Sequence, residues 1–175
     1  MSSAAYASVS ADGGAIQVRE ATPDDRAAIY DVLLTSQIFG RTDAECVDEM
    51  FSETWSKPRP DGYRWLCCVD EAGHTLGFTC YGVESLTQDT WDLFWICVRP
   101  EARGRGVGRA LMDETVLRAQ RENGRVLVIY TSSTAHYAPA RRLYTGAGFA
   151  QIATVPDYYS DGDSLHIYWR RLVSR

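Results

Sequence analysis

The sequence has no apolar run long enough to cross a membrane, because its hydrophobic residues fall into short segments broken by polar ones. Its first residues have neither a basic start nor an apolar block, so a secretory signal is not expected. Positive charge is scarce, since 18 Lys and Arg stand against 23 Asp and Glu and give a formal net charge of −5. These absences argue against a membrane partner and against a broad nucleic-acid-binding surface.

Paired cysteines are also missing. The chain has five cysteines, an odd number, and none of them are spaced as CxxC. Because four of the five lie in apolar, strand-like segments, we expect them to be small buried hydrophobes and predict no disulfide framework and no metal site. Free thiols of this kind fit the reducing cytoplasm, which is the expected location.

The length of 175 residues and a 45% share of hydrophobic residues fit one globular domain. We expect residues 1–15 to be a disordered N-terminal tail and residues 16–175 to form a single domain. Apolar and alternating patterns predict about seven strands, at 16–20, 63–70, 75–83, 90–98, 125–132, 149–155 and 164–172. Capping patterns and helical spacing predict helices after Thr22, after Thr42, over about 108–123 and from Pro139. This order is typical of a mixed α/β domain with helices on both faces of a central sheet.

The segment RPEARGRGVGRALM, residues 99–112, concentrates glycine and arginine between a strand and a helix. It is not a P-loop, because no lysine follows the glycines, and neither reading frame gives GxGxxG. What remains is Arg103-x-x-Gly106-x-Gly108 at a strand-to-helix junction. Glycines let several N–H groups point into one concavity, and the helix start adds partial positive charge, so a pyrophosphate is the expected ligand. The alternative is a glycine-rich turn with solvated arginines.

Together with ARRLYTGAGF (140–149) and IQVREATPDD (16–25), this segment resembles the GNAT superfamily of N-acetyltransferases over nearly all of the chain from Ile16 to Leu172. The resemblance implies the GNAT fold, a mixed and mostly antiparallel sheet of about seven strands, and acetyl-CoA as cosubstrate with no metal. It implies direct transfer of the acetyl group to a primary amine in a ternary complex. The implied coenzyme-binding residues are Ile96, Cys97 and Val98 through their main chain, and Arg103, Gly104, Arg105, Gly106, Val107, Gly108 and Arg109.

Acetyl transfer to an amine needs a group that removes a proton from the amine and one that protonates the leaving thiolate. Tyr144 matches the tyrosine of the family's L-Y pair and is the candidate general acid, although it could instead be a core tyrosine. Asp92, among apolar neighbours on the strand before the glycine segment, is the candidate base. Glu84 is the competing carboxylate, and ordered water could also serve.

The resemblance places the acceptor between residues 35–43 and 156–163. Aromatic residues and carboxylates there suit an ammonium-bearing small molecule or peptide. The candidate acceptor-binding residues are Phe39, Glu84, Tyr158 and Tyr159. A non-catalytic acyl-CoA-binding domain remains an alternative, while an enzyme acting on aminoacyl-tRNA is disfavoured by the acidic net charge. The chain could act as a monomer or a homodimer.

Overall fold

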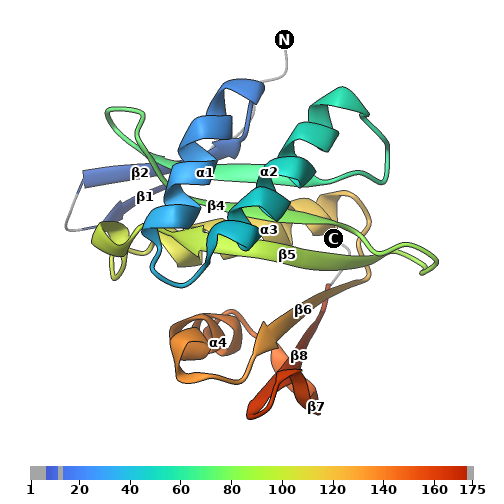
Figure 1. Cartoon of the computed structure of the whole chain (residues 1–175). Helices are drawn as coiled ribbons and strands as arrows, with labels where there is room; N and C mark the ends of the chain where they lie inside the picture. The colour runs from blue at the N-terminus through green and yellow to red at the C-terminus, as the bar shows by residue number, and fades with distance from the viewer. Residues whose placement is uncertain (1–6, 12–13, 173–175) are drawn as a thin grey trace.

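The apolar and alternating segments become the strands of one twisted sheet in the computed structural model, which describes residues 7–11 and 14–172 (Figure 1). Its eight strands lie in the order β1-β2-β3-β4-β5-β6-β8-β7, and every neighbouring pair is antiparallel except β5 and β6. The strands are β1 (Ala7–Ala11), β2 (Gly14–Glu20), β3 (Arg64–Asp70), β4 (Thr75–Val83), β5 (Thr90–Val98), β6 (Val126–Ser132), β7 (Ala150–Ser160) and β8 (Asp163–Arg171).

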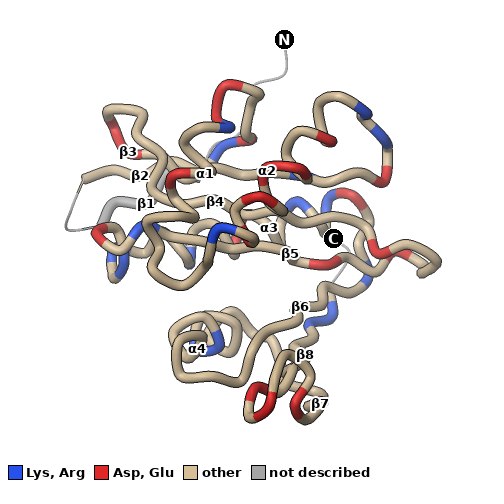
Figure 2. The backbone as a smooth tube through the Cα atoms, in the orientation of Figure 1, with Lys and Arg blue, Asp and Glu red and all other residues tan. Residues whose placement is uncertain are grey.

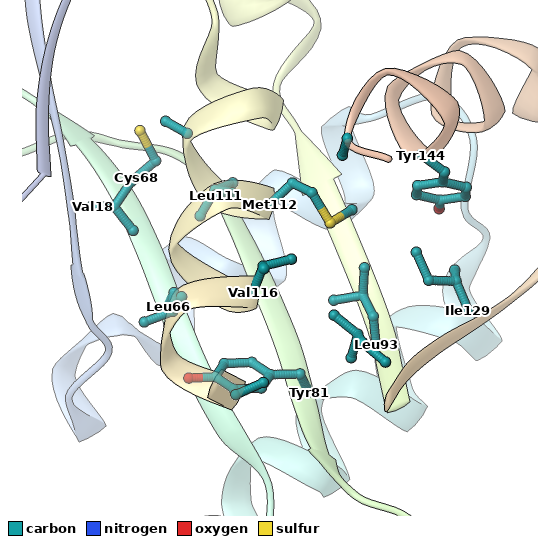
Figure 3. Close-up of a cluster of buried hydrophobic side chains, with 14 of the residues drawn as sticks. Val18, Leu66, Cys68, Tyr81, Leu93, Leu111, Met112, Val116, Ile129 and Tyr144 are labelled. Carbon is teal, nitrogen blue, oxygen red and sulfur yellow. The ribbon is translucent and has the colours of Figure 1, made fainter. Parts of the chain in front are cut away.

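Helices cover both faces of this sheet, as expected (Figure 1). One hydrophobic layer lies between the sheet and helices α1 and α2, and a second lies between the sheet and helices α3 and α4. Figure 3 shows part of this second layer, where Leu111, Met112 and Val116 of α3 meet side chains of the strands. The helices are α1 (Arg26–Thr35), α2 (Arg41–Ser56), α3 (Val107–Arg121) and α4 (Ala138–Gly146), with short 3-10 helices η1 (Pro23–Asp25), η2 (Pro100–Ala102) and η3 (Ala135–Tyr137).

Two segments that were predicted as a tail and a loop form strands in the structure. Residues 1–15 were expected to be a disordered tail, but residues 7–11 form β1, which pairs with β2 and extends the sheet; residues 1–6 and 12–13 lie outside the described residues. The segment 156–163 was expected to be a loop, but β7 continues to Ser160 and only a tight turn separates it from β8. The strand accommodates Pro156 by bulging there, because the register passes from Val155 opposite Leu165 to Ser160 opposite Asp163.

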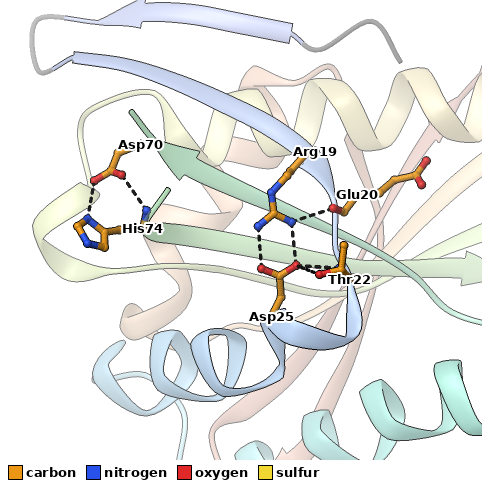
Figure 4. A network of polar contacts seen from close by, with 6 residues as sticks. All are labelled: Arg19, Glu20, Thr22, Asp25, Asp70 and His74. Atoms are coloured by element: carbon orange, nitrogen blue, oxygen red, sulfur yellow. Dashed lines mark hydrogen bonds and ion pairs between the residues drawn. The ribbon is translucent and has the colours of Figure 1, made fainter. Parts of the chain in front are cut away.

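A polar network fixes the start of η1 and α1 (Figure 4). Asp25 accepts two hydrogen bonds from Arg19, at 2.7 and 2.8 Å, and one from the N–H of Thr22 at 2.7 Å, which confirms the predicted acid of the capping box. Burial alone would raise the pKa of Asp25, but these hydrogen bonds outweigh it and hold the pKa below its usual value. The same figure shows Asp70 bonded to His74 across the β3–β4 turn.

The start of α2 differs by two residues from the expected one. Thr42 was the predicted N-cap, whereas the helix begins at Arg41 after Gly40. The N–H of Gly40 donates to Oδ2 of Asp43 at 2.8 Å, so Asp43 supplies the acid of this cap. The earlier start makes Asp43 the third residue of the helix, beside the loop that joins α1 to α2.

Helix α3 approaches the sheet closely because β4 carries Gly77 beneath it. A Cβ on Gly77 would lie 2.6 Å from the carbonyl oxygen of Cys97 and 3.2 Å from the side chains of Val107 and Leu111. A side chain there would therefore push the first turn of α3 away from β4 and β5.

We expect Gly77→Ala to lower the free energy of unfolding by about 1–3 kcal/mol, because overpacking costs that much in a filled interior. Gly146→Ala is the matched control, since a Cβ there meets nothing within 4 Å in α4, and it should be neutral or slightly stabilising. Urea unfolding of the three proteins measures the difference, and equal midpoints for Gly77→Ala and the parent would show that the helix is not held at this distance.

Candidate active site

Strands β5 and β6 separate partway along their length, and this opens a cleft. They pair in parallel only from Thr90 opposite Val126 to Asp92 opposite Val128, although β5 continues to Val98 and β6 to Ser132. Figure 1 shows β6 leaving the plane of β5 with β8, β7 and α4. Residues 93–98 and 129–132 form facing walls of a cleft of about 640 Å³. Among the described residues, the later part of β5 thus has no strand partner on its β6 side.

A β-bulge lies where the separation begins. Cys80 of β4 is opposite Trp95 while the next residue, Tyr81, is opposite Leu93, so Phe94 is an extra residue in β5. Leu93 packs towards α3, whereas Phe94 and Trp95 both pack towards α1 and α2. Such a bulge bends its strand and redirects side chains. Here it carries the rest of β5 away from β6.

The glycine-rich segment closes one end of the cleft and opens α3. Gly104 and Gly106 have φ angles of 75° and 81°, a left-handed conformation that glycine adopts at little cost. Gly106 is the N-cap of α3, so the first N–H groups of that helix have no intrahelical acceptor. A Cβ at either glycine would meet nothing within 4 Å, so the space over the loop is open. The loop can therefore present main-chain donors and the positive helix end to an anion.

Of the three arginines between residues 103 and 109, two line the cleft and one does not. The Arg103 side chain crosses to the end of α1 and donates to the carbonyl oxygen of Ser36 at 2.6 Å, and Arg109 pairs with Asp113 at 2.7 Å. Arg105 was predicted with them but does not line the cleft; its charge acts on Cys68 of β3. The other nine predicted coenzyme-binding residues do line it: Ile96, Cys97, Val98, Arg103, Gly104, Gly106, Val107, Gly108 and Arg109.

Tyr144 of α4 faces the cleft from the side opposite β5. Its side chain is 5% exposed, and its ring makes an edge contact with Tyr168 at 5.5 Å between centroids. Figure 3 shows it beside Ile129 of β6. Burial raises the pKa of Tyr144 well above its usual value, and the hydroxyl of Thr131, a hydrogen-bond partner, only partly opposes this. The phenol is therefore neutral near pH 7 and can donate a proton.

Asp92 lies at the last β5–β6 pair and is 6% exposed. Burial first, and then the charge of Glu84, raise the pKa of Asp92 to about 7. Its Oδ1 is buried and makes no hydrogen bond to any residue that the structure describes. Asp92 does not line the cleft, but its charge adds to the effect of burial in raising the pKa of Tyr130, which does. This carboxylate exchanges a proton near neutral pH beside the cleft.

The predicted acceptor-binding residues divide into two pairs. Phe39 and Tyr159 line the cleft. Tyr158 packs edge-on against Tyr159, with 5.0 Å between ring centroids, and Glu84 is beside Asp92, but neither lines the cleft. Tyr159 reaches the cleft because of the β7 bulge, which turns residues 156–159 out of the regular alternation.

The cleft is also lined by residues that were not among the predicted site residues, and several of these are acidic or aromatic. They come from segments far apart in the sequence, so no local pattern links them; only the two acids, which lie within the predicted acceptor segments 35–43 and 156–163, could have been suspected. The carboxylate of Asp163 accepts from Ser132 Oγ at 2.7 Å. The additional residues include Asp43, Trp95, Tyr130, Tyr137 and Asp163.

The five cysteines are all free thiols. Cys97 lines the cleft through β5, while its Sγ turns away towards the carbonyl oxygen of Val32, and burial raises the pKa of this thiol to about 11. It is therefore protonated and a poor nucleophile near pH 7. Across the described ranges, no group of three or more His, Cys, Asp or Glu side chains is placed to hold a metal ion. No helix in that part of the chain is both long and apolar enough to span a membrane.

Comparison with known proteins agrees with this geometry. Residues 61–151 match the family model of the acetyltransferase (GNAT) domain. A GNAT-family protein from Desulfovibrio desulfuricans is 31% identical, with a TM-score of 0.85 over 90% of this chain and 99% of that one. A GCN5-related N-acetyltransferase from Kribbella flavida is 28% identical, with a TM-score of 0.72 over 90% and 98% of the two chains.

The protein yncA from Salmonella typhimurium, whose structure contains acetyl-CoA, shares the fold at 21% identity, with a TM-score of 0.72 over 91% of this chain and 95% of that one. No curated protein sequence matches. The family match covers more than half of the chain and includes β5, the glycine-rich segment, α3 and α4. The chain belongs to the GNAT family of acetyltransferases.

Proposed function

We propose that the protein transfers the acetyl group of acetyl-CoA to a primary amine by direct attack, with both substrates held in the cleft between β5 and β6. The observation that carries this proposal is the left-handed glycine loop at the start of α3, which opens into the same cleft that Tyr144 lines. Acetyl-CoA bound to yncA of the same fold supports the choice of coenzyme. The free thiols fit a cytoplasmic location.

The main chain does most of the coenzyme binding in this proposal. The N–H groups from Gly104 to Arg109 hold the pyrophosphate, and the arginine side chains add charge. The unpaired edge of β5 at Ile96, Cys97 and Val98 bonds the pantetheine arm as a strand would. The coenzyme supplies an activated acetyl thioester, and the cleft holds it next to the amine.

The proton transfers are assigned to two buried side chains. Asp92, ionised above pH 7, takes the proton of the amine, directly or through one water. Tyr144, which burial keeps protonated, gives its proton to the departing thiolate. Phe39 and Tyr159 lie beside the amine. Tyr158 packs against Tyr159, and the charge of Glu84 helps to raise the pKa of Asp92.

Gly106→Asp is expected to abolish acetyl-CoA binding, because it adds a negative charge and an unfavourable backbone conformation to an anion site. Gly73→Asp is the matched control, since Gly73 also has a positive φ, of 85°, and open space, but lies in the β3–β4 turn. Thermal shift measures this: binding at 100 times the dissociation constant adds about 2.7 kcal/mol of stability. Normal stabilisation of Gly106→Asp by acetyl-CoA would refute the loop assignment.

Tyr144→Phe is expected to keep acetyl-CoA affinity and to lower kcat by about 100-fold, as loss of a general acid does. Tyr168→Phe also removes a buried phenol next to the same helix and should change kcat little. Thiol release in the presence of an amine panel reports turnover. Unchanged kcat for Tyr144→Phe would refute the assignment of the general acid, whereas binding of acetyl-CoA with no transfer to any amine would point to the non-catalytic alternative.

The pH dependence of kcat/KM tests Asp92. Because the base works when ionised, activity should fall as the pH drops through about 7. Glu84→Gln removes a charge that raises the pKa of Asp92, so this acidic limb should move to lower pH, whereas Asp92→Asn should remove it. The acceptor amine titrates identically in all three proteins, so a limb shared by all three would belong to the amine and not to Asp92.

A further inference from the structure

The cleft holds carboxylates that no cation neutralises. Asp43 from the first turn of α2 and Asp163 from the start of β8 both line it, and neither forms an ion pair within the described residues. The arginines that line the cleft come from the glycine loop and α3 and are engaged elsewhere, Arg103 with Ser36 and Arg109 with Asp113. Both carboxylates are half-buried, so their charges remain available to a cationic ligand in the cleft.

Each of these carboxylates is held in place by one oxygen and keeps the other available. Oδ1 of Asp163 accepts from Ser132 Oγ at 2.7 Å and from the N–H of Ser133 at 3.1 Å. Oδ2 of Asp43 accepts from the N–H of Gly40 at 2.8 Å. The second oxygen of each makes no hydrogen bond within the described part of the chain, so it can accept from a ligand. Figure 2 shows acidic residues gathered at the β7–β8 turn.

Aromatic rings join the two carboxylates into one site. Tyr137 also lines the cleft and is near both: burial first, and then Asp43, Tyr159 and Asp163, raise its pKa. Phe39 makes edge contacts with Tyr137 at 6.1 Å and with Trp95 at 5.3 Å between ring centroids. Rings and carboxylates around one space suit an organic cation, which gains from both.

In the proposed function the reacting amine has a carboxylate of its own, apart from Asp43 and Asp163. Asp92 is a buried carboxylate with an unpartnered oxygen, and its charge, like that of Asp163, raises the pKa of Tyr159, after burial and Tyr158. The amine that attacks must be neutral at that moment, so it loses its charge attraction when it reacts. A second group that stays protonated would keep its attraction to Asp43 and Asp163 through the reaction.

We infer that the acceptor is a small molecule with a second cationic group, an ammonium or guanidinium, held by Asp43 and Asp163 among the aromatic side chains of Phe39, Trp95, Tyr137 and Tyr159. This inference rests on the proposed function, because it concerns the acceptor of the same reaction. Both carboxylates line the cleft that receives the thioester, so the two nitrogen groups belong to one compact acceptor. An amine whose far end carries a carboxylate is disfavoured there.

The test compares three acceptors with the same carbon chain: terminal diaminobutane, butylamine and terminal aminobutanoate. Isothermal calorimetry on the protein saturated with coenzyme A measures binding without turnover. Diaminobutane should bind at least about 10-fold more tightly than butylamine, as a charge-assisted hydrogen bond allows, and aminobutanoate should bind most weakly. The same order is expected in kcat/KM with acetyl-CoA.

Asp43→Asn and Asp163→Asn keep the carbonyl oxygen that their neighbours need but remove the charge. Each should reduce the preference for diaminobutane several-fold, and the double variant should abolish it. Asp61→Asn makes the same charge change on an exposed residue outside this cleft and should leave the preference intact. Equal affinity for diaminobutane and butylamine, or a preference that survives in the double variant, overturns this inference alone. Failure to bind acetyl-CoA or coenzyme A overturns the proposed function as well.

Discussion

The separation of β5 from β6 is the constraint on which the rest of the site depends. A sheet that stayed paired would bury both strand edges and leave no cleft. Here three residue pairs hold the two strands together, and the bulge at Phe94 then parts them. The exposed edge of β5 and the wall of β6 exist only because that pairing stops, and α3 and α4 can face one space only because the two halves of the sheet diverge.

The separation also explains the environments of the Asp92 carboxyl group and the Tyr144 phenol. Asp92 lies at the last paired position, where the sheet is still closed enough to exclude water but the cleft begins one residue later. Tyr144 is covered by Tyr168 on one side and faces the cleft on the other. Burial raises the pKa of both groups, of Tyr144 in the wall of the cleft and of Asp92 at the residue pair beside it.

Much of this arrangement could be predicted from the sequence, where the signals are local. Spacing alone predicts the glycine loop, the helix after it and the apolar strand at 125–132. Positions with φ > 0 and apolar runs depend on neighbouring residues, so the sequence shows them directly. Spacing could not show that Arg105, unlike Arg103 and Arg109, does not line the cleft; its charge acts on Cys68 of β3. The strand at 156–160 was missed because Pro156 and the acidic residues after it favour turns, and only the pairing with β8 overrides them.

The proposed acceptor wall could be predicted only in part, for a further physical reason. In the proposed function the coenzyme side uses main-chain groups of one continuous stretch, residues 96–109, so its chemistry depends on backbone conformation and tolerates many side chains. The proposed acceptor side uses side chains from α2, the α1–α2 connection, β5, η3 and the β7–β8 hairpin, which the fold brings to one cleft. On this proposal, substitutions in those segments can change which amine fits without disturbing the glycine loop. The choice of acceptor then depends on which side chains meet across the cleft, and Tyr137, near both Asp43 and Asp163, belongs to that set.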